Sequence, residues 1–361
     1  MKILIVKLSS LGDIIHTLPA VAWVRRARPE AEIAWIVERP FAELLEGSPV
    51  LDRLITVDTR RWRRALGSPA TWREIRAMGS DLRRQSFDLA FDFQGLIKSG
   101  VIAALSGAPR RIGRETAALK EPASRFFLTE QVPVLSSEHV IDQHLQLVRS
   151  AFGQGASVGD AGAGSGYEFP LFISERDREF VQDSLRAVGI REFVVLAPGG
   201  GWAAKRWPPI CFAEIADFLH EAYGLASVIP IGPAEENLAA EIVRGCRRAR
   251  PLVLPCSLKQ LAALCDRARL FLGGDTGPLH LAAARATPLV ALYGPTSARR
   301  NGPFDPRDEV VEQSLDQGYR YYSRRADPTS MLQIPVESVK QAIERRLALT
   351  ASGTELRWQT R

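Results

Sequence analysis

The sequence predicts an α/β protein made of two doubly wound parallel sheets. Short β-branched apolar runs alternate with helical segments, which is typical of βαβ units, and this alternation restarts after a glycine-rich stretch near the middle of the chain. The chain has 361 residues, of which 46% are hydrophobic and 24% charged, so it can bury two cores.

The first half begins with a strand over 2–7, because KILIVK is a short, β-branched apolar run. A turn rich in serine and glycine follows, and residues 14–24 then carry apolar side chains at helical spacing. The same reasoning predicts strands over 33–37, 54–57 and 89–93 and a helix over 72–85.

Residues 153–166 contain six glycines and no large apolar residue, a composition typical of a flexible linker. We therefore expect an amino-terminal domain over 1–152, a linker over 153–170, a carboxy-terminal domain over 171–335, and a helix with a tail over 336–361. In the second half the predicted strands cover 193–196, 226–231, 270–273 and 289–293, and the predicted helices cover 211–223, 235–248, 258–267, 278–285 and 336–349.

Positive charge is concentrated in the first half. The net charge is +6, and residues 1–150 carry 22 Lys and Arg against 17 Asp and Glu, while residues 60–125 carry 14 against 6. Such a field attracts phosphates, carboxylates, nucleic acid or an anionic membrane. The arginines at 60–64 and 110–114 are clustered more tightly than a solvated helix face explains. No helix-turn-helix, zinc-finger or aromatic stacking motif supports nucleic acid as the partner.

Several other classes of protein lack their usual signatures. No run of 18 apolar residues occurs, and the opening apolar run is too short for a signal peptide, so we expect a cytoplasmic protein. The four cysteines form no CxxC pair and no HExxH occurs, so we expect free buried thiols and no metal site. They are Cys211, Cys246, Cys256 and Cys265.

The turn after the first strand could carry chemistry. Asp13 lies close to the start of the helix that follows, where a carboxylate can cap the helix or face a ligand as a general base. The backbone N–H groups of the same turn can receive an anion.

Three turns in the second half suit a nucleotide. At 272–284 a glycine turn leads into a helix that Thr276 can cap and Pro278 can open, and such a helix end favours a diphosphate. At 197–208 three consecutive glycines allow a ligand to approach the backbone, and Lys205 adds positive charge. At 231–236 an acid can hold a ribose or complement the helix dipole. Neither GxGxxG nor GxxxxGK[ST] occurs, so NAD and P-loop chemistry are not predicted.

Together these strings resemble glycosyltransferase family 9, the ADP-heptose:lipopolysaccharide heptosyltransferases, and within it the heptosyltransferase I type. The resemblance runs from about residue 1 to 349 and rests on KLSSLGDIIHTLPA (7–20), RRWR (60–63), DFQGLIKS (92–99), KRWP (205–208) and GDTGPLH (274–280).

The resemblance implies a GT-B fold, in which two Rossmann-like domains face each other across a cleft. It also implies inversion at the transferred anomeric carbon, with no metal and no cofactor. Asp13 matches the catalytic base, and Lys205 matches the lysine that steadies the donor diphosphate. Gly200 and Gly201 stand where the family has hydroxyl residues, so phosphate contacts there would come from the backbone.

The resemblance also implies further contacts on both substrates. The carboxy-terminal domain would bind the nucleotide sugar through Glu235 or Glu236, Cys256, Asp275, Thr276, Gly277 and His280. The amino-terminal domain would bind the acceptor, with its Kdo carboxylates and lipid A phosphates, through Ser10, Gly12, Arg60, Arg61, Arg63, Gln94, Lys98, Arg114 and Lys120.

The function that follows from the resemblance is transfer of L-glycero-D-manno-heptose from ADP-heptose to the Kdo of Kdo2-lipid A. The enzyme would be a monomer at the cytoplasmic face of the inner membrane, peripherally associated, with no nucleic-acid partner. Three alternatives stay open: a transferase that adds a later core heptose, a GT-B nucleotide-sugar epimerase, and a non-catalytic binder of phosphoglycolipid or nucleic acid.

Overall fold

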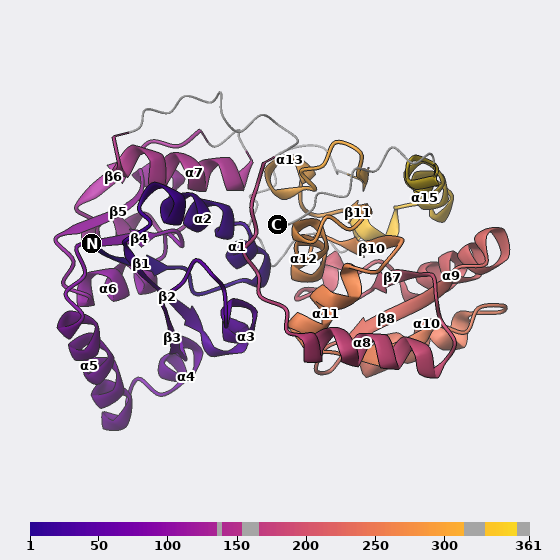
Figure 1. Ribbon diagram of the computed structural model, residues 1–361, viewed down its shortest axis with the longest axis horizontal. Helices are drawn as coiled ribbons and strands as arrows, with labels where there is room; N and C mark the ends of the chain where they lie inside the picture. Colours follow the sequence, from indigo (N-terminus) through magenta and orange to yellow (C-terminus); the bar gives the residue numbers. More distant parts are fainter. Residues whose placement is uncertain (136–138, 154–165, 314–328, 352–361) are drawn as a thin grey trace. The chain divides into compact units, whose positions relative to one another are not determined.

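The computed structural model describes residues 1–135, 139–153, 166–313 and 329–351. Contacts divide these residues into two compact units (Figure 1). The first contains the described residues up to 153 together with Gly166–Phe172, and the second contains those from Ile173 onward. Most of the expected linker and of the carboxy-terminal tail lies outside the described residues.

The first unit is built on a six-stranded sheet in the order β3-β2-β1-β4-β5-β6, with every neighbouring pair parallel. This is the strand order of a doubly wound fold, and the direction of winding reverses between β1 and β4. The strands are β1 (Lys2–Val6), β2 (Glu32–Glu38), β3 (Arg53–Val57), β4 (Leu89–Asp92), β5 (Arg110–Arg114) and β6 (Glu130–Val132).

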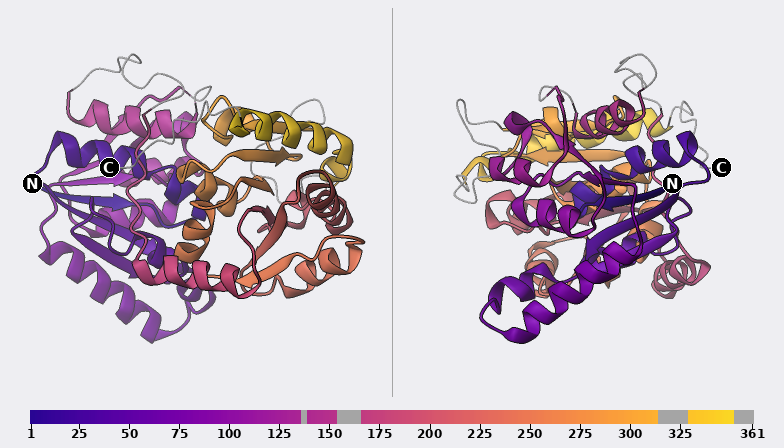
Figure 2. Two further views of the ribbon diagram at one scale, coloured as in Figure 1. Left: turned by 45° about the vertical axis from the view of Figure 1, so that its right-hand side comes forward. Right: turned by 90° about the vertical axis from the view of Figure 1, so that its left-hand side faces the viewer.

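Helices cover both faces of this sheet (Figures 1 and 2). On one face α2 (Leu18–Ala27) packs against α7 (Val140–Ala151). The other carries α4 (Thr59–Arg64), α5 (Pro69–Arg84) and α6 (Ile97–Leu105), whose apolar side chains form a core with Leu4 and Val6 of β1 and Ala34 and Ile36 of β2. Shorter helices are α1 (Leu11–Ile15), η1 (Arg39–Phe41), α3 (Ala42–Leu45), η2 (Thr116–Ala118) and η3 (Pro122–Phe127).

The second unit repeats the architecture. Its sheet has the order β12-β11-β10-β7-β8-β9, again parallel throughout, and reverses between β7 and β10. The strands are β7 (Phe193–Ala197), β8 (Ala226–Ile231), β9 (Leu252–Pro255), β10 (Leu270–Gly274), β11 (Leu289–Tyr293) and β12 (Glu309–Glu312).

The helices of the second unit also form two layers (Figure 1). One layer packs on the larger core and consists of α9 (Pro209–Tyr223), α10 (Glu236–Gly245) and α15 (Val336–Ala351). The other consists of α8 (Glu175–Ala187), α11 (Leu258–Cys265) and α12 (Gly277–Ala284), and the short helices are η4 (Ala203–Lys205), α13 (Ala298–Asn301) and α14 (Thr329–Leu332). A buried ion pair between Arg346 and Asp308, at 3.1 Å, fastens α15 to the start of β12.

The predicted fold class is confirmed, and each predicted strand lies within about a residue of an observed one. The helix expected over 14–24 is two helices, α1 and α2, which are separated at His16 and Thr17. Strands β5, β6, β9 and β12 were not predicted. For β5 and β12 the reason is composition: β5 reads RRIGR and β12 reads EVVE, so neither has the apolar run that signals a buried strand. β9 reads LVLP, so its short apolar run was overlooked.

Three further expectations concern the membrane, the thiols and the linker. No helix in the described ranges is long and apolar enough to cross a membrane. All four cysteines are free, as expected, but only Cys265 is buried and the other three are half-buried. Residues 166–170, expected in the linker, and 171–172, expected in the carboxy-terminal domain, belong to the first unit, where Ser48 Oγ donates to the carbonyl of Pro170 at 2.7 Å.

Candidate active site

The turn after β1 lies where the first sheet reverses its winding, which is where ligands bind in open parallel sheets. Gln94, which follows β4, holds this turn. Its Oε1 accepts hydrogen bonds from the backbone N–H groups of Leu8 and Ser9, at 3.0 and 3.2 Å. Gln94 was predicted to contact the acceptor, yet it is 5% exposed and supports the turn from within.

Asp13 is the third residue of α1, and its side chain is 24% exposed. Its Oδ2 accepts hydrogen bonds from the backbone N–H and the hydroxyl of Ser10, at 3.1 and 3.0 Å. Gly12 is buried beside it in the same helix. Asp13 therefore does take the capping role that the sequence allows, and part of its carboxylate remains open to solvent.

Two lysines flank this carboxylate. Lys7 Nζ lies 3.7 Å from Oδ1 of Asp13, and Lys120 Nζ lies 3.7 Å from Oδ2. Burial alone would raise the pKa of Asp13, but the positive charges of Lys7 and Lys120 and the N–H of Ser10 hold that pKa well below its usual value. Asp13 is therefore ionised at neutral pH and able to accept a proton.

Lys7 is a site residue that the sequence argument did not select. Its side chain is 1% exposed, and its Nζ donates to the carbonyl oxygen of Phe93 at 2.9 Å. Burial lowers the pKa of Lys7 to about 7, although the nearby carboxylate of Asp13 acts in the opposite direction. The sequence did offer a signal for Lys7, namely a lysine at the end of an otherwise apolar strand. A lysine is rarely buried without a partner, so this position indicates a nearby anionic group.

Arg114 belongs to the buried support of this turn. Its Nη2 donates to Nε2 of His144 at 2.6 Å, and His144 Nδ1 lies 3.0 Å from the carbonyl oxygen of His16. Burial, and then the charge of Arg114, hold the pKa of His144 well below its usual value. His144 is therefore neutral, donating from Nδ1 and accepting at Nε2. At 7% exposure, Arg114 lies largely in the interior of the first unit.

The cationic residues of α4 and α6 are more accessible. Arg60, Arg61 and Arg63 are exposed on α4, and Arg61 forms an ion pair with Glu74. Lys98 Nζ donates to Thr59 Oγ1 at 3.2 Å and lies 3.5 Å from a buried carboxylate oxygen of Glu38, so it ties α6 to the start of α4.

The second arginine cluster differs from expectation. Arg110 donates two hydrogen bonds to the carboxylate of Glu130, at 2.7 and 2.9 Å, across β5 and β6. Arg111 donates to the carbonyl oxygens of Phe127 and Ala108, at 2.8 and 2.7 Å. Both arginine side chains therefore bind groups of the protein itself, on β6, on η3 and in the loop before β5.

In the second unit the turn after β10 is organised around Asp275, which is 4% exposed. Its two carboxylate oxygens accept hydrogen bonds from Lys205 Nζ (2.5 Å), Thr296 Oγ1 (2.8 Å), Asn301 Nδ2 (2.7 Å) and His280 Nε2 (3.1 Å). Burial acts to raise the pKa of Asp275, but the hydrogen bond from His280 and the charge and hydrogen bond of Lys205 lower that pKa well below its usual value. Asp275 is an ionised anchor beneath the turn.

Thr276 occupies the N-cap of α12, as expected, although its side chain makes no capping hydrogen bond. Its Oγ1 is buried and has no hydrogen-bond partner among the described residues. Gly277 begins α12, with Pro278 in the first turn as expected. A buried hydroxyl without a partner beside an eight-residue helix start is suited to an anion that the protein itself does not supply.

Lys205 is not a solvated surface lysine. It is 17% exposed and its ammonium group donates to both the carboxylate and the carbonyl oxygen of Asp275, at 2.5 and 3.2 Å. It also lies 5.2 Å from the ring centre of Trp202. Two residues from separate turns, after β7 and after β10, thus fix the lysine at the carboxyl edge of the second sheet.

The glycines after β7 differ in what they permit. A Cβ added to Gly199 would lie 2.1 Å from Oε1 of Glu235, whereas one added to Gly201 would meet open space. The carbonyl of Gly200 accepts hydrogen bonds from Arg206 Nε and Nη2, at 3.0 and 2.8 Å. Position 199 therefore requires glycine, because the carboxylate of Glu235 lies too close to the backbone there for a Cβ atom.

The structure separates the two candidate ribose acids. Glu235 is half-buried at the N-cap of α10, with Oε2 accepting from the backbone N–H of Gly232 at 2.9 Å, while Glu236 is exposed in the first helical turn. Only Glu235 is brought to the turn after β7. Cys256 follows β9, and its N–H donates to the carbonyl of Ile231 at the end of β8.

Thr296 and Asn301 are further residues that the sequence argument missed. Both follow β11 and bond Asp275, and no local motif marked them. Among the described residues, no three His, Cys, Asp or Glu side chains lie together as a metal site.

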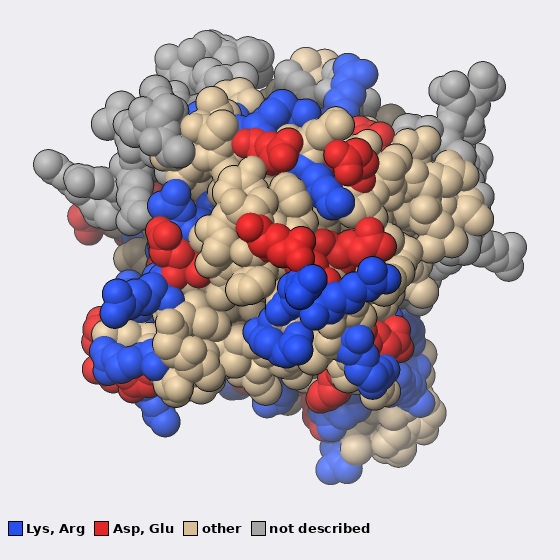
Figure 3. All heavy atoms as spheres, turned by 90° about the vertical axis from the view of Figure 1, so that its right-hand side faces the viewer, with Lys and Arg blue, Asp and Glu red and all other residues tan. Residues whose placement is uncertain are grey.

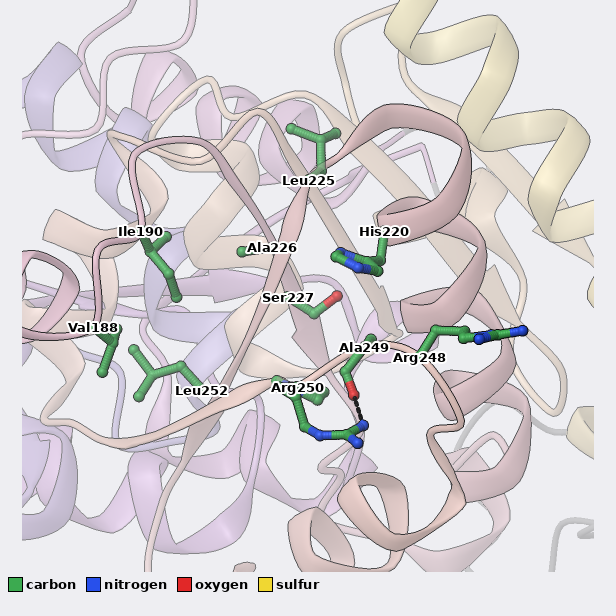
Figure 4. A pocket seen from close by; sticks show the side chains of 11 residues that line it. Val188, Ile190, His220, Leu225, Ala226, Ser227, Arg248, Ala249, Arg250 and Leu252 are labelled. Carbon is green, nitrogen blue, oxygen red and sulfur yellow. Dashed lines mark hydrogen bonds between the residues drawn. The ribbon is translucent and has the colours of Figure 1, made fainter.

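A separate hollow of about 540 Å³ lies at the amino ends of β8 and β9. It is lined by residues such as His220, Ser227 and Arg248 (Figure 4), and none of the predicted site residues belongs to it. It is therefore at the opposite end of the second sheet from the turns described above.

Comparison with known proteins gives consistent matches. The family model for glycosyltransferase family 9 (heptosyltransferase) matches residues 75–327. Lipopolysaccharide heptosyltransferase 1 of Pseudomonas aeruginosa is 33% identical over 308 residues, covering 84% of this chain and 81% of the relative. Lipopolysaccharide heptosyltransferase 1 of Escherichia coli O18:K1:H7 is 28% identical over 348 residues, covering 95% and 97%.

A solved structure agrees with these relatives. The E. coli heptosyltransferase WaaC with ADP-2-deoxy-2-fluoro heptose superposes with a TM-score of 0.74 at 27% identity, covering 95% of this chain and 99% of that chain.

Proposed function

The chain belongs to glycosyltransferase family 9, with the GT-B fold of its structural relatives, and is a glycosyltransferase of lipopolysaccharide synthesis. We propose that it transfers L-glycero-D-manno-heptose from ADP-heptose to the Kdo of Kdo2-lipid A, with inversion and without a metal. The observation that carries this proposal is the Asp13 carboxylate, ionised and partly exposed between Lys7 and Lys120 at the carboxyl edge of the first sheet.

The reaction would be a direct displacement. An acceptor hydroxyl oxygen forms a bond to the anomeric carbon of heptose while the bond from that carbon to the ADP oxygen breaks. Asp13 takes the proton of the hydroxyl, and ADP leaves with the electron pair of the broken bond. A single attack from the face opposite ADP inverts the configuration.

The second unit would bind the leaving ADP. The ammonium group of Lys205, held by Asp275, and the unpartnered hydroxyl of Thr276 at the start of α12 would meet the charge that grows on the diphosphate. Gly200 and Gly201 would offer backbone N–H groups to the phosphates. Glu235 is the better candidate for the ribose hydroxyls because it lies against Gly199.

The anionic acceptor would meet the cationic side chains of the first unit. Arg60, Arg61 and Arg63 on α4 are exposed and suited to bidentate bonds with carboxylates and phosphates. The buried residues Gln94 and Arg114 would act through the turn that they support. We further propose that the enzyme works as a monomer at the cytoplasmic face of the inner membrane.

The proposal is tested by incubating the protein with ADP-heptose, other nucleotide sugars, and acceptors with and without terminal Kdo or a first core heptose. We expect transfer only from ADP-heptose and only to the Kdo acceptor, undiminished by a metal chelator. Transfer that requires an existing heptose would assign a later step of the core. Release of free sugar without any acceptor would assign an epimerase.

A further inference from the structure

Large apolar side chains are exposed on η3 and at the start of α6. Phe126 is 74% exposed and Ile97 is 42% exposed. The two elements pack together, since the N–H of Ile97 donates to a carboxylate oxygen of Glu121 at 2.7 Å and Phe127 lies against Gly100. Among the large hydrophobic side chains that the structure describes, that of Phe126 is the most exposed.

A second pair of exposed apolar residues lies between α4 and α5. Leu66 is 50% and Trp72 47% exposed, and Trp72 Nε1 donates to the carbonyl of Leu66 at 2.8 Å. Because Lys98 on α6 bonds Thr59 at the start of α4, these helices form one connected layer over the first sheet (Figure 2).

Cations accompany these side chains. The guanidinium of Arg125 lies 4.8 Å from the ring centre of Phe126, and Arg64, Arg73 and Arg76 are exposed on α4 and α5. Residues 60–125, which cover most of this layer, hold 14 Lys and Arg against 6 Asp and Glu. Apolar and aromatic tips beside cations are the composition of surfaces that bind anionic bilayers.

The second unit offers a contrast. It also exposes single apolar residues, such as Val188 at 55% and Ile210 at 54%. Figure 3 shows, however, that Asp and Glu lie among the Lys and Arg on the face that it draws. In the second unit, for example, Arg248 pairs with Glu221 at 3.4 Å. Mixed charge of this kind gives no net attraction to an anionic surface.

We propose that the docking face, defined by Leu66, Trp72, Ile97, Arg125 and Phe126, seats the protein on an anionic lipid bilayer. Phe126 and Trp72 enter the headgroup region, and Arg64, Arg73, Arg76 and Arg125 bind the lipid phosphates. The inference rests on the proposed function, since an acceptor anchored by acyl chains has to be reached at a membrane surface.

The test measures cosedimentation with vesicles of phosphatidylcholine, with and without phosphatidylglycerol. The native protein binds only the anionic vesicles. The double variant Phe126→Asp/Trp72→Asp binds them about ten-fold or more weakly, since each aromatic contributes apolar burial and each added acid opposes the lipid charge. The matched control, Val188→Asp/Ile210→Asp, changes net charge equally and binds like the native protein.

A second readout separates docking from catalysis. Transfer to a deacylated, water-soluble Kdo acceptor stays unchanged in both double variants, because neither alters the turn at Asp13. The inference is overturned if the double variant binds anionic vesicles as well as the native protein. It is equally overturned if the native protein ignores these vesicles, as it would if the face served a protein partner. Absence of transfer by the native protein would instead contradict the proposed function and leave the vesicle result standing.

Discussion

The ammonium group of Lys7 lies 3.7 Å from the carboxylate of Asp13, and only Asp13 of the two reaches solvent. The lysine therefore acts on the carboxylate from the protein side, while the Asp13 side chain stays 24% exposed. This arrangement can keep a base ionised without blocking it.

Replacing Lys7 with methionine should raise the pKa of Asp13. The charges that lower this pKa come from Lys7, Lys120 and His16, whereas burial raises it. When the charge of Lys7 is removed, the effect of burial on the pKa of Asp13 is opposed less. Since the base must be ionised, the acid limb of kcat/KM should move to higher pH. A pH profile measures this shift. The exposed Lys2→Met variant should leave the limb unchanged, and an unshifted Lys7→Met profile would show that Lys7 does not tune Asp13.

Asp13→Asn should lower turnover by about a hundred- to ten-thousand-fold, the contribution typical of a positioned general base. The amide keeps the size of the side chain, so ADP affinity should stay within a few-fold. Steady-state rates and calorimetry measure the two effects, with the exposed Asp81→Asn as a control. Substantial residual turnover would remove Asp13 from the role of base.

Lys205→Ala should weaken ADP binding by roughly 1.5–3 kcal/mol, the range for a hydrogen bond to a charged group. Calorimetry measures the affinity, and urea unfolding checks that the unpaired Asp275 has not unfolded the unit. Arg269→Ala is the matched control, because this exposed cation lies just before β10, at the other end of the strand. Equal ADP affinity in both variants would count against the assigned role of Lys205.

Gly199→Ala should weaken ADP binding, whereas Gly201→Ala should not. The new Cβ at position 199 would lie 2.1 Å from Oε1 of Glu235 and push its carboxylate away from the turn, while position 201 is open. Glu235→Gln should reproduce the loss and Glu236→Gln should be silent. If Gly199→Ala binds ADP normally, the carboxylate of Glu235 is not a ribose ligand.

Arg346→Met should destabilise the second unit by about 3–5 kcal/mol, because it leaves the carboxylate of Asp308 buried without its charged partner. Arg345→Met removes the neighbouring, exposed ion pair with Glu309 and should cost about 0–1 kcal/mol. Urea unfolding compares the two variants. Similar losses would mean that burial does not distinguish these pairs.

The sequence by itself determined the two parallel sheets and the positions of their functional turns. Strand periodicity and glycine-rich turns are local properties, so KILIVK and the run before Gly274 could be assigned without knowing their neighbours. Charged strands such as β5 escaped this reasoning, since their burial comes from the strands beside them.

Only the tertiary structure decided what the polar residues of those turns do. Lys205 and Asp275 are 70 residues apart and form one partly buried pair, and Gln94 bonds the backbone N–H of Leu8 from 86 residues away. Lys7 is a buried neighbour of Asp13, and the hydroxyl of Thr276 has no hydrogen-bond partner within the described residues. Desolvation and the effect of nearby charges depend on distances in space. Folding sets these distances between residues that no local sequence pattern connects.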